Sequence, residues 1–243
     1  MYKNVEIYGN SVEFYEIAAL SQSMNIENIL KKFSEMTKLN EGIILDIGAG
    51  TGKTTLEMAK LVPDKSLIAL EPSAYMRIAF MAKLMESKDK LSQITILPYS
   101  IEQYSFEEEI SGILCMGVLG HLNMEERKHL WKILDDKLKK NVPILIEVLD
   151  PRFLEIKKGT RIAVAFQGRL RYETYVTDVK YSSGKRWEWL LTYRVSYGEK
   201  IINEVNSPMW WNYDRIEDIL TELAQVNFRG IKLGETLLLA IKN

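Results

Sequence analysis

The stretch Ile43-Ile44-Leu45-Asp46-Ile47-Gly48-Ala49-Gly50-Thr51-Gly52 passes from an apolar segment through one acid into three glycines. An apolar run that ends near an acid is typical of a buried parallel strand. The three glycines that follow lie at every second position, and without a Cβ they let the backbone turn tightly and come close to a ligand. Residues 53–62 have the composition of a helix, so the glycine loop joins a strand end to a helix N-terminus. In open α/β sheets this place binds nucleotide-like ligands.

Apolar runs and amphipathic helices alternate along most of the chain. Further strands are expected at 66–70, 93–98, 111–116, 142–149, 228–233 and 236–241, with helices at 53–62, 73–85, 124–140 and 214–226. This order predicts βαβ units and therefore an α/β fold, a Rossmann-like, mostly parallel seven-stranded sheet with helices on both faces.

Local signals mark where two of these helices begin. Ser73 is a candidate N-cap, and Asn123 with Glu126 resembles a capping box. The helix that follows Ser73 is expected to turn four apolar residues inward, namely Ile78, Met81, Ala82 and Met85.

The pattern changes after the fifth strand. Between about residues 155 and 212 apolar and polar residues alternate, as in Trp187, Trp189, Leu191 and Tyr193, and a period of two is typical of half-exposed antiparallel strands. We therefore expect a ligand-binding domain made of 1–152 and 213–243, and an antiparallel β insertion at 153–212 that forms a cap on the acceptor side.

Composition excludes several classes of protein. The chain has 243 residues, 47% of them hydrophobic and 27% charged, with a net charge of −1. That charge argues against nucleic acid and anionic membranes as partners. The single cysteine, Cys115, excludes an internal disulfide and a Cys-rich zinc site, so we expect no metal and a reducing, cytoplasmic location. No long apolar run predicts a signal peptide or a membrane span, and a monomer or homodimer is expected.

Three kinds of ligand are considered for the glycine loop, namely a nucleoside triphosphate, a dinucleotide and S-adenosylmethionine. Gly52-Lys53-Thr54 resembles the end of a phosphate-binding P-loop, but Ile47 stands where that motif needs its first glycine. A dinucleotide fingerprint needs a third glycine at the position of Lys53. The third ligand is S-adenosylmethionine.

The spacing of Asp46, Gly48, Gly50 and Gly52 resembles the first motif of the class I S-adenosylmethionine-dependent methyltransferases, written E/D-x-G-x-G-x-G. Glu71 ends the next strand, 19 residues after Gly52, where a carboxylate can accept both ribose hydroxyls. The loop 117–122, with His121 followed by a leucine, resembles small-molecule members, notably the aminosugar N,N-dimethyltransferases. The motif-level resemblance covers about residues 10–150.

This resemblance implies a set of cofactor contacts. The glycine loop, including Ala49, contacts the methionine part, and Glu71 holds the ribose. Pro72, Ser73 and Met76 lie along ribose and adenine, Ser100 and Ile101 flank the adenine, and Cys115 and Met116 line the floor near the sulfonium. Ser100 stands where the family commonly has an acid, so the adenine amino group is held either by Ser100 or by backbone oxygen.

The acceptor side carries the candidate catalytic groups. His121 follows a strand end and is either a substrate contact and base or a histidine bonded to a backbone carbonyl. Tyr15, in a Tyr-Glu pair that resembles the family's Tyr-Asp, is the second candidate, and Tyr8 is a candidate contact beside it. Glu147 could orient a cationic acceptor. Aromatic residues of the insertion are candidate pocket walls as well as core of the small sheet, namely Trp187, Trp189 and Trp210.

The sequence thus predicts an S-adenosylmethionine-dependent methyltransferase that acts on a small molecule or peptide, at an amine. Two alternatives stay open. One is an RNA methyltransferase of the same fold, and the other is a non-catalytic nucleoside-binding module.

Overall fold

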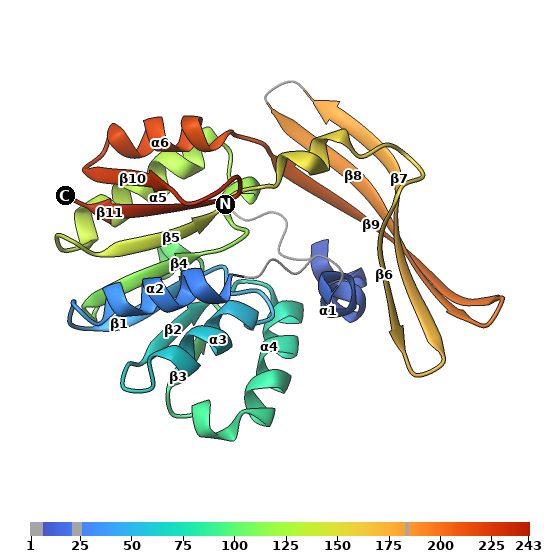
Figure 1. Cartoon of the computed structure of the whole chain (residues 1–243), viewed down its shortest axis with the longest axis horizontal. Helices are drawn as coiled ribbons and strands as arrows, with labels where there is room; N and C mark the ends of the chain where they lie inside the picture. Colours follow the sequence, from blue (N-terminus) through green and yellow to red (C-terminus); the bar gives the residue numbers. More distant parts are fainter. Residues whose placement is uncertain (1–6, 21–25, 183–184) are drawn as a thin grey trace. The chain divides into compact units, whose positions relative to one another are not determined.

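The computed structural model describes residues 7–20, 26–182 and 185–243 of the chain. It divides into two compact units (Figure 1). We call Ile26–Asp150 with Tyr213–Asn243 the α/β unit, and Met1–Asn25 with Pro151–Asn212 the β-sheet unit. The division differs from the predicted domains at the N-terminus, because the described residues before 21 group with the antiparallel strands.

The α/β unit is built on one seven-stranded sheet of order β10-β11-β5-β4-β1-β2-β3. Strands β1 to β5 are parallel, whereas β11 runs antiparallel to β5 and β10. This arrangement confirms the predicted fold class. The strands are β1 (Ile43–Ile47), β2 (Leu67–Leu70), β3 (Ile94–Leu97), β4 (Ile110–Cys115), β5 (Pro143–Glu147), β10 (Phe228–Lys232) and β11 (Leu237–Lys242).

Helices cover both faces of this sheet because β1 is apolar on both faces. Ile43, Leu45 and Ile47 pack into a core with side chains of α5 (Met124–Lys137) and α6 (Ile216–Ala224). Ile44 packs into a second core with α2 (Glu27–Thr37), α3 (Lys53–Leu61) and α4 (Ala74–Glu86). A strand that is buried on both sides is mostly apolar, and β1 has this property except at Asp46, a buried acid that accepts the Thr55 hydroxyl.

The predicted inward face of α4 is wrong. Ile78 is 68% exposed, and Met81 and Met85 are also exposed, whereas Met76, Phe80 and Leu84 form the buried stripe. Apolar residues lie on nearly every side of this helix, so hydrophobic periodicity does not fix its rotation. The predicted caps are confirmed, since the Ser73 hydroxyl accepts the Met76 N–H and Asn123 with Glu126 forms a capping box.

The β-sheet unit is a four-stranded antiparallel sheet whose strands follow one another in order. They are β6 (Arg161–Gln167), β7 (Leu170–Ser182), β8 (Arg186–Tyr197) and β9 (Lys200–Asn212). One face carries α1 (Val12–Leu20), whose Phe14 stacks on Tyr193 with ring centroids 5.0 Å apart. Phe14 is buried in a small core with Tyr193 and Val195, which explains why the N-terminal residues belong to this unit.

Candidate functional site

The glycine loop after β1 needs its glycines for two different reasons. All three have positive φ angles, of 66° at Gly48, 57° at Gly50 and 76° at Gly52. A Cβ on Gly48 would lie 2.7 Å from Val118, and a Cβ on Gly52 would overlap the ring of Phe80. Gly50 is different, because apart from its chain neighbours no atom of the described residues lies within 4 Å of its Cβ position. The loop is therefore packed at both ends and open beside Gly50, at the N-terminus of α3.

Glu71, at the end of β2, is fixed against this loop by two backbone groups. Its carboxylate accepts the N–H of Gly50 at 2.7 Å and the N–H of Ser73 at 2.7 Å, one on each oxygen. Burial raises the pKa of the carboxyl, and these two hydrogen bonds act in the opposite direction. Each oxygen has a second lone pair, so Glu71 can still accept two hydroxyl groups of a ligand beside Gly50.

Asp46 is held inside the unit, at the base of the loop. It is 2% exposed and accepts the hydroxyl of Thr55, on α3, at 2.5 Å. Burial raises its pKa to about 7, with a smaller contribution from Glu71, while the Thr55 hydrogen bond lowers it. Burial and the charge of Asp46 raise the pKa of the Cys115 thiol, which is therefore neutral at physiological pH.

The strand ends beside the loop carry His121 and Glu147. Cys115 pairs with Ile146 in the parallel β4–β5 ladder, so Met116 and Glu147 follow at the same edge of the sheet. His121 ends a 3-10 turn, η4 (Leu119–His121), and burial lowers its pKa to about 4. Its imidazole is therefore neutral at pH 7. Burial raises the pKa of the Glu147 carboxyl, and the charge of Lys53 opposes this.

The remaining predicted cofactor contacts also lie in the α/β unit. Ser100 and Ile101 follow β3 and are buried, and the N–H of Ser100 donates to the side-chain carbonyl of Gln103 at 2.9 Å. Pro72 and Met76 lie between β2 and the first turn of α4, with Met76 buried. Thus β1, β2, β3 and β4 each place predicted contacts at their carboxyl ends, as expected for a ligand site of an open α/β sheet.

The predicted acceptor residues of the β-sheet unit fall on two faces. Trp187 stacks on Trp189 with centroids 6.2 Å apart, and Tyr181 packs on Trp187 at 5.0 Å. In the β8–β9 register Trp211 pairs with Trp187, whereas Trp210 pairs with Glu188 and lies on the opposite face. There the guanidinium of Arg186 lies 4.3 Å from its ring centroid.

Tyr181 and Trp211, which share the face of Trp187, are not among the predicted site residues. A period of two puts Trp210 and Trp211 on opposite faces, but only the register of β8 with its neighbours shows that Trp211 and Tyr181 share the face of Trp187. Tyr8 and Tyr15 contact each other edge to face, with ring centroids 6.1 Å apart.

Residues 44–141 match a family described as a methyltransferase domain. No curated protein sequence matches the chain.

Among solved structures, the amino pentose methyltransferase CalS10 of Micromonospora echinaspora, with S-adenosylmethionine bound, has a TM-score of 0.73 at 13% identity, over 94% of this chain and 96% of that one. The sugar N-methyltransferase KedS8 of a Streptoalloteichus species has a TM-score of 0.68 at 13% identity, over 89% and 86%. The glycopeptide N-methyltransferase MtfA, in complex with S-adenosyl-L-homocysteine, has a TM-score of 0.58 at 16% identity, over 88% and 87%.

Residues 44–141, which include the glycine loop and Glu71, therefore match a methyltransferase domain, and the fold is one that known methyltransferases share. The match over residues 44–141 and the methyltransferases that share the fold support the predicted enzyme class and S-adenosylmethionine as cofactor. The open space beside Gly50 and the free lone pairs of Glu71 fit this cofactor. Within residues 7–20, 26–182 and 185–243, no helix is long and apolar enough to cross a membrane.

Proposed function

We propose that this enzyme methylates an amine of a small molecule or peptide. The observation that carries the proposal is the Glu71 carboxylate, fixed by the Gly50 N–H at the mouth of an open glycine loop. Structures with the same fold include methyltransferases of an amino pentose, of a sugar nitrogen and of a glycopeptide nitrogen, which supports nitrogen as the accepting atom.

In this proposal the α/β unit holds the cofactor by the contacts that the motif implies. Glu71 accepts the ribose hydroxyls, and the loop from Gly48 to Gly52 contacts the methionine part. The adenine lies against four residues, Pro72, Met76, Ser100 and Ile101, and Cys115 with Met116 forms the floor. Bound S-adenosylmethionine would supply an activated methyl group to an acceptor nitrogen that arrives with a free lone pair.

His121 acts as a neutral group toward the acceptor. With a pKa of about 4, its imidazole does not take a full proton from an aliphatic ammonium near pH 7. It can still accept or donate one hydrogen bond and so orient the acceptor nitrogen. The acceleration then comes mainly from placing that nitrogen in line with the methyl group. Tyr15 is the second candidate for such a contact, and in this proposal Glu147 attracts a cationic acceptor.

We further propose that the aromatic face of the β-sheet unit recognises the acceptor. Trp189 is 6% exposed, and its indole N–H has no hydrogen-bond partner among the described residues. A buried donor without a partner is rare in native proteins. Together with the neighbouring rings of Trp187 and Tyr181 it suits a flat or apolar acceptor that carries a hydrogen-bond acceptor atom. Tyr8 and Trp210 stay predicted contacts.

Calorimetry with S-adenosyl-L-homocysteine tests the cofactor site. We expect binding by the wild type and a Kd about 100-fold higher in Glu71→Ala, since hydrogen bonds from two hydroxyl groups to a carboxylate are lost. Glu57→Ala, an exposed acid of α3 that pairs with Lys60, is the matched control and should leave the Kd unchanged. If the wild type does not bind S-adenosyl-L-homocysteine, or if Glu71→Ala binds it equally well, the proposed cofactor site is refuted.

A panel of amines and alcohols then tests the acceptor. Methyl transfer to an amine supports the proposal, and cofactor binding without transfer to any compound favours a non-catalytic module. Binding of tRNA with a steep salt dependence would favour an RNA methyltransferase instead. The cytoplasmic location, the absence of a nucleic-acid partner and the monomer or homodimer stay predictions.

A further inference from the structure

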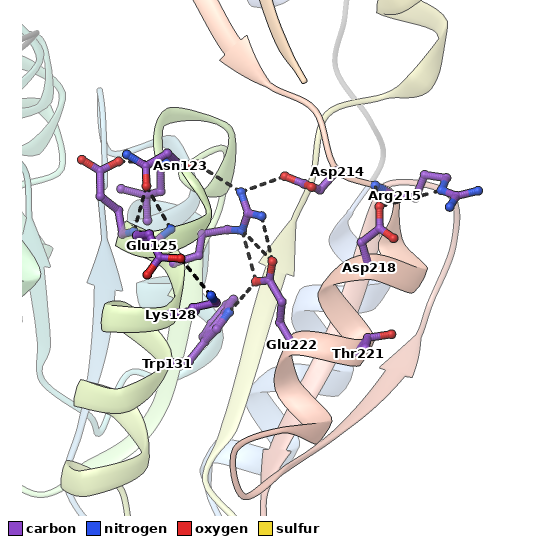
Figure 2. Close-up of polar contacts among 12 residues, drawn as sticks. Asn123, Glu125, Lys128, Trp131, Asp214, Arg215, Asp218, Thr221 and Glu222 are labelled. Carbon is purple, nitrogen blue, oxygen red and sulfur yellow. Dashed lines mark hydrogen bonds and ion pairs between the residues drawn. The ribbon is translucent and has the colours of Figure 1, made fainter. Parts of the chain in front are cut away.

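A buried guanidinium that the proposed chemistry does not use lies between α5 and α6. Arg127, in the second turn of α5, is 2% exposed. It pairs with Asp214 through Nη1 at 2.7 Å and with Glu222 through Nη2 at 2.8 Å, and its Nε donates to Glu222 at 3.1 Å. Trp131 donates its indole N–H to the same carboxylate at 2.9 Å (Figure 2). Figure 2 shows Trp131 and Glu222 pointing toward one another from the two helices.

One further contact of Arg127 leads to the candidate site. Its Nη1 also donates to the carbonyl oxygen of Leu122 at 3.1 Å. Leu122 directly follows His121, and its N–H closes the turn by donating to Leu119 at 3.1 Å. The next residue, Asn123, begins α5 with its capping box. The turn that carries His121 is thus held at its far end by a guanidinium whose other partners lie outside the turn.

These other partners belong to the returning part of the chain. Asp214 is the second residue after β9, and Glu222 lies on α6. Glu222 alone would hold α5 to α6, because its carboxylate binds both the Nε and the Nη2 group of the guanidinium. The second carboxylate, that of Asp214, is therefore not required for an ion pair between the two helices. The Nη1 group, shared by Asp214 and Leu122, is the part of the guanidinium that connects the segment after β9 with the turn.

We propose that Arg127 is a positioning residue for His121, which fixes the Leu119–His121 turn to Asp214 and α6 through the Leu122 carbonyl. The inference deepens the proposed function, on which it rests for the role of His121 toward the acceptor. A purely structural Arg127 would only hold α5 to α6. A positioning Arg127 also determines the environment of the imidazole.

Nuclear magnetic resonance of the histidines distinguishes the two roles and needs no acceptor. The chain has two histidines, and His129 is exposed on α5, so His129→Gln leaves one imidazole signal to titrate. In this background His121 should titrate near pH 4. Arg127→Lys keeps the charge but cannot reach all three partners, and we expect the midpoint of His121 to rise by at least ~1 pH unit toward its ordinary value.

Two control variants separate positioning from stability. Trp131→Phe removes a hydrogen bond to Glu222 without touching Leu122, so it should lower the urea midpoint and leave the His121 titration unchanged. Lys128→Ala, at the exposed neighbour of Arg127 that pairs with Glu125, should change neither. If Arg127→Lys does not fold, Asp214→Ala takes its place, with a smaller rise expected.

Equal His121 midpoints in the wild type and the folded variant would overturn the inference, as would an equal rise in Trp131→Phe. Binding of S-adenosyl-L-homocysteine, measured on the same samples, should stay within about twofold of the wild type. A wild type that binds none refutes the proposed function, whereas the His121 titration still decides the role of Arg127.

Discussion

The two units of the molecule bury their strands in different ways. In the α/β unit, β1 is buried on both faces, and the site is made at strand ends, from backbone N–H groups and carboxylates beside glycines. In the β-sheet unit, each strand alternates between two faces, and the proposed recognition groups Trp187, Trp189 and Tyr181 are side chains on one of them. A site made of backbone turns depends on a few residues adjacent in sequence. A site on a sheet face depends on the register of several strands.

The largest change in stability is expected when two glycines, one in each unit, are replaced by alanine. Gly52 and Gly168 both have positive φ, but a Cβ at Gly52 would meet Phe80, whereas a Cβ at Gly168 would meet none of the residues that the structure describes. Gly52→Ala should lower the free energy of unfolding by about 4 kcal/mol, from backbone strain and overpacking together. Gly168→Ala should cost about 1 kcal/mol, from strain alone. Urea unfolding followed by circular dichroism measures both free energies. Equal losses of stability in the two variants would contradict the claim that Gly52 lies in a packed turn and Gly168 in an open one.

Buried acids should respond to pH with opposite signs in the two units. Asp46 has its pKa raised from 3.8 to about 7 by burial, so between these values the native state holds more protons than the unfolded state and stability falls as pH rises. Asp46→Asn keeps an oxygen that accepts the Thr55 hydroxyl, and because the amide does not titrate, the fall in stability with rising pH is removed. We expect the variant to gain stability over the wild type from pH 4 to 7, reaching a difference on the order of 3 kcal/mol at pH 8.

Glu173 of the β-sheet unit provides the opposite case. Burial raises the pKa of its carboxyl, but contacts with Arg161, Tyr175 and Arg171 outweigh burial and lower it below 4.5. Its charged form therefore stabilises the native state above the unfolded pKa, and this contribution is lost as pH falls through the lowered pKa. Glu173→Gln should be less stable than the wild type at pH 7 and approach it in acid. If the stability difference from the wild type changed with pH in the same direction for Asp46→Asn and Glu173→Gln, the opposite pKa shifts of the two acids would be contradicted.

The smallest effect is expected for two buried indoles. Trp131 donates to Glu222, whereas Trp189 has no partner for its N–H among the described residues. Trp131→Phe leaves part of a buried carboxylate unsatisfied and should cost about 2 kcal/mol. Trp189→Phe removes an unsatisfied donor and should leave stability within about 0.5 kcal/mol. Thermal melts of the two variants give the comparison, and a large loss in Trp189→Phe would mean that its N–H has a partner in solution.

Local chemistry made much of the α/β unit predictable from sequence. The apolar run before Gly48, the N-cap of Ser73 and the capping box at Asn123 each depend on residues within a few positions of one another. The rotation of α4 was not predictable in this way, because its buried stripe is selected by the space that Gly52 leaves for Phe80.

Long-range pairing was the other obstacle. The bond between Arg127 and Glu222 spans 95 residues. A signal for it was nevertheless present, since Arg127 lies at helical spacing with the buried Leu130, Trp131 and Leu134. An arginine on the apolar face of a helix needs a buried carboxylate. The face of Trp210 likewise required the register of β8 and β9.

The contact between Gly48 and Val118 has a consequence for motion. Val118 occupies the space that a Cβ on Gly48 would need, and it directly precedes the turn that carries His121. If one of these two segments moved alone, a void would open between them and their van der Waals contacts would be lost, so we expect the two segments to move together. Cofactor exchange at the glycine loop and rearrangement of the His121 turn should therefore be a single kinetic event, with one relaxation rate for both.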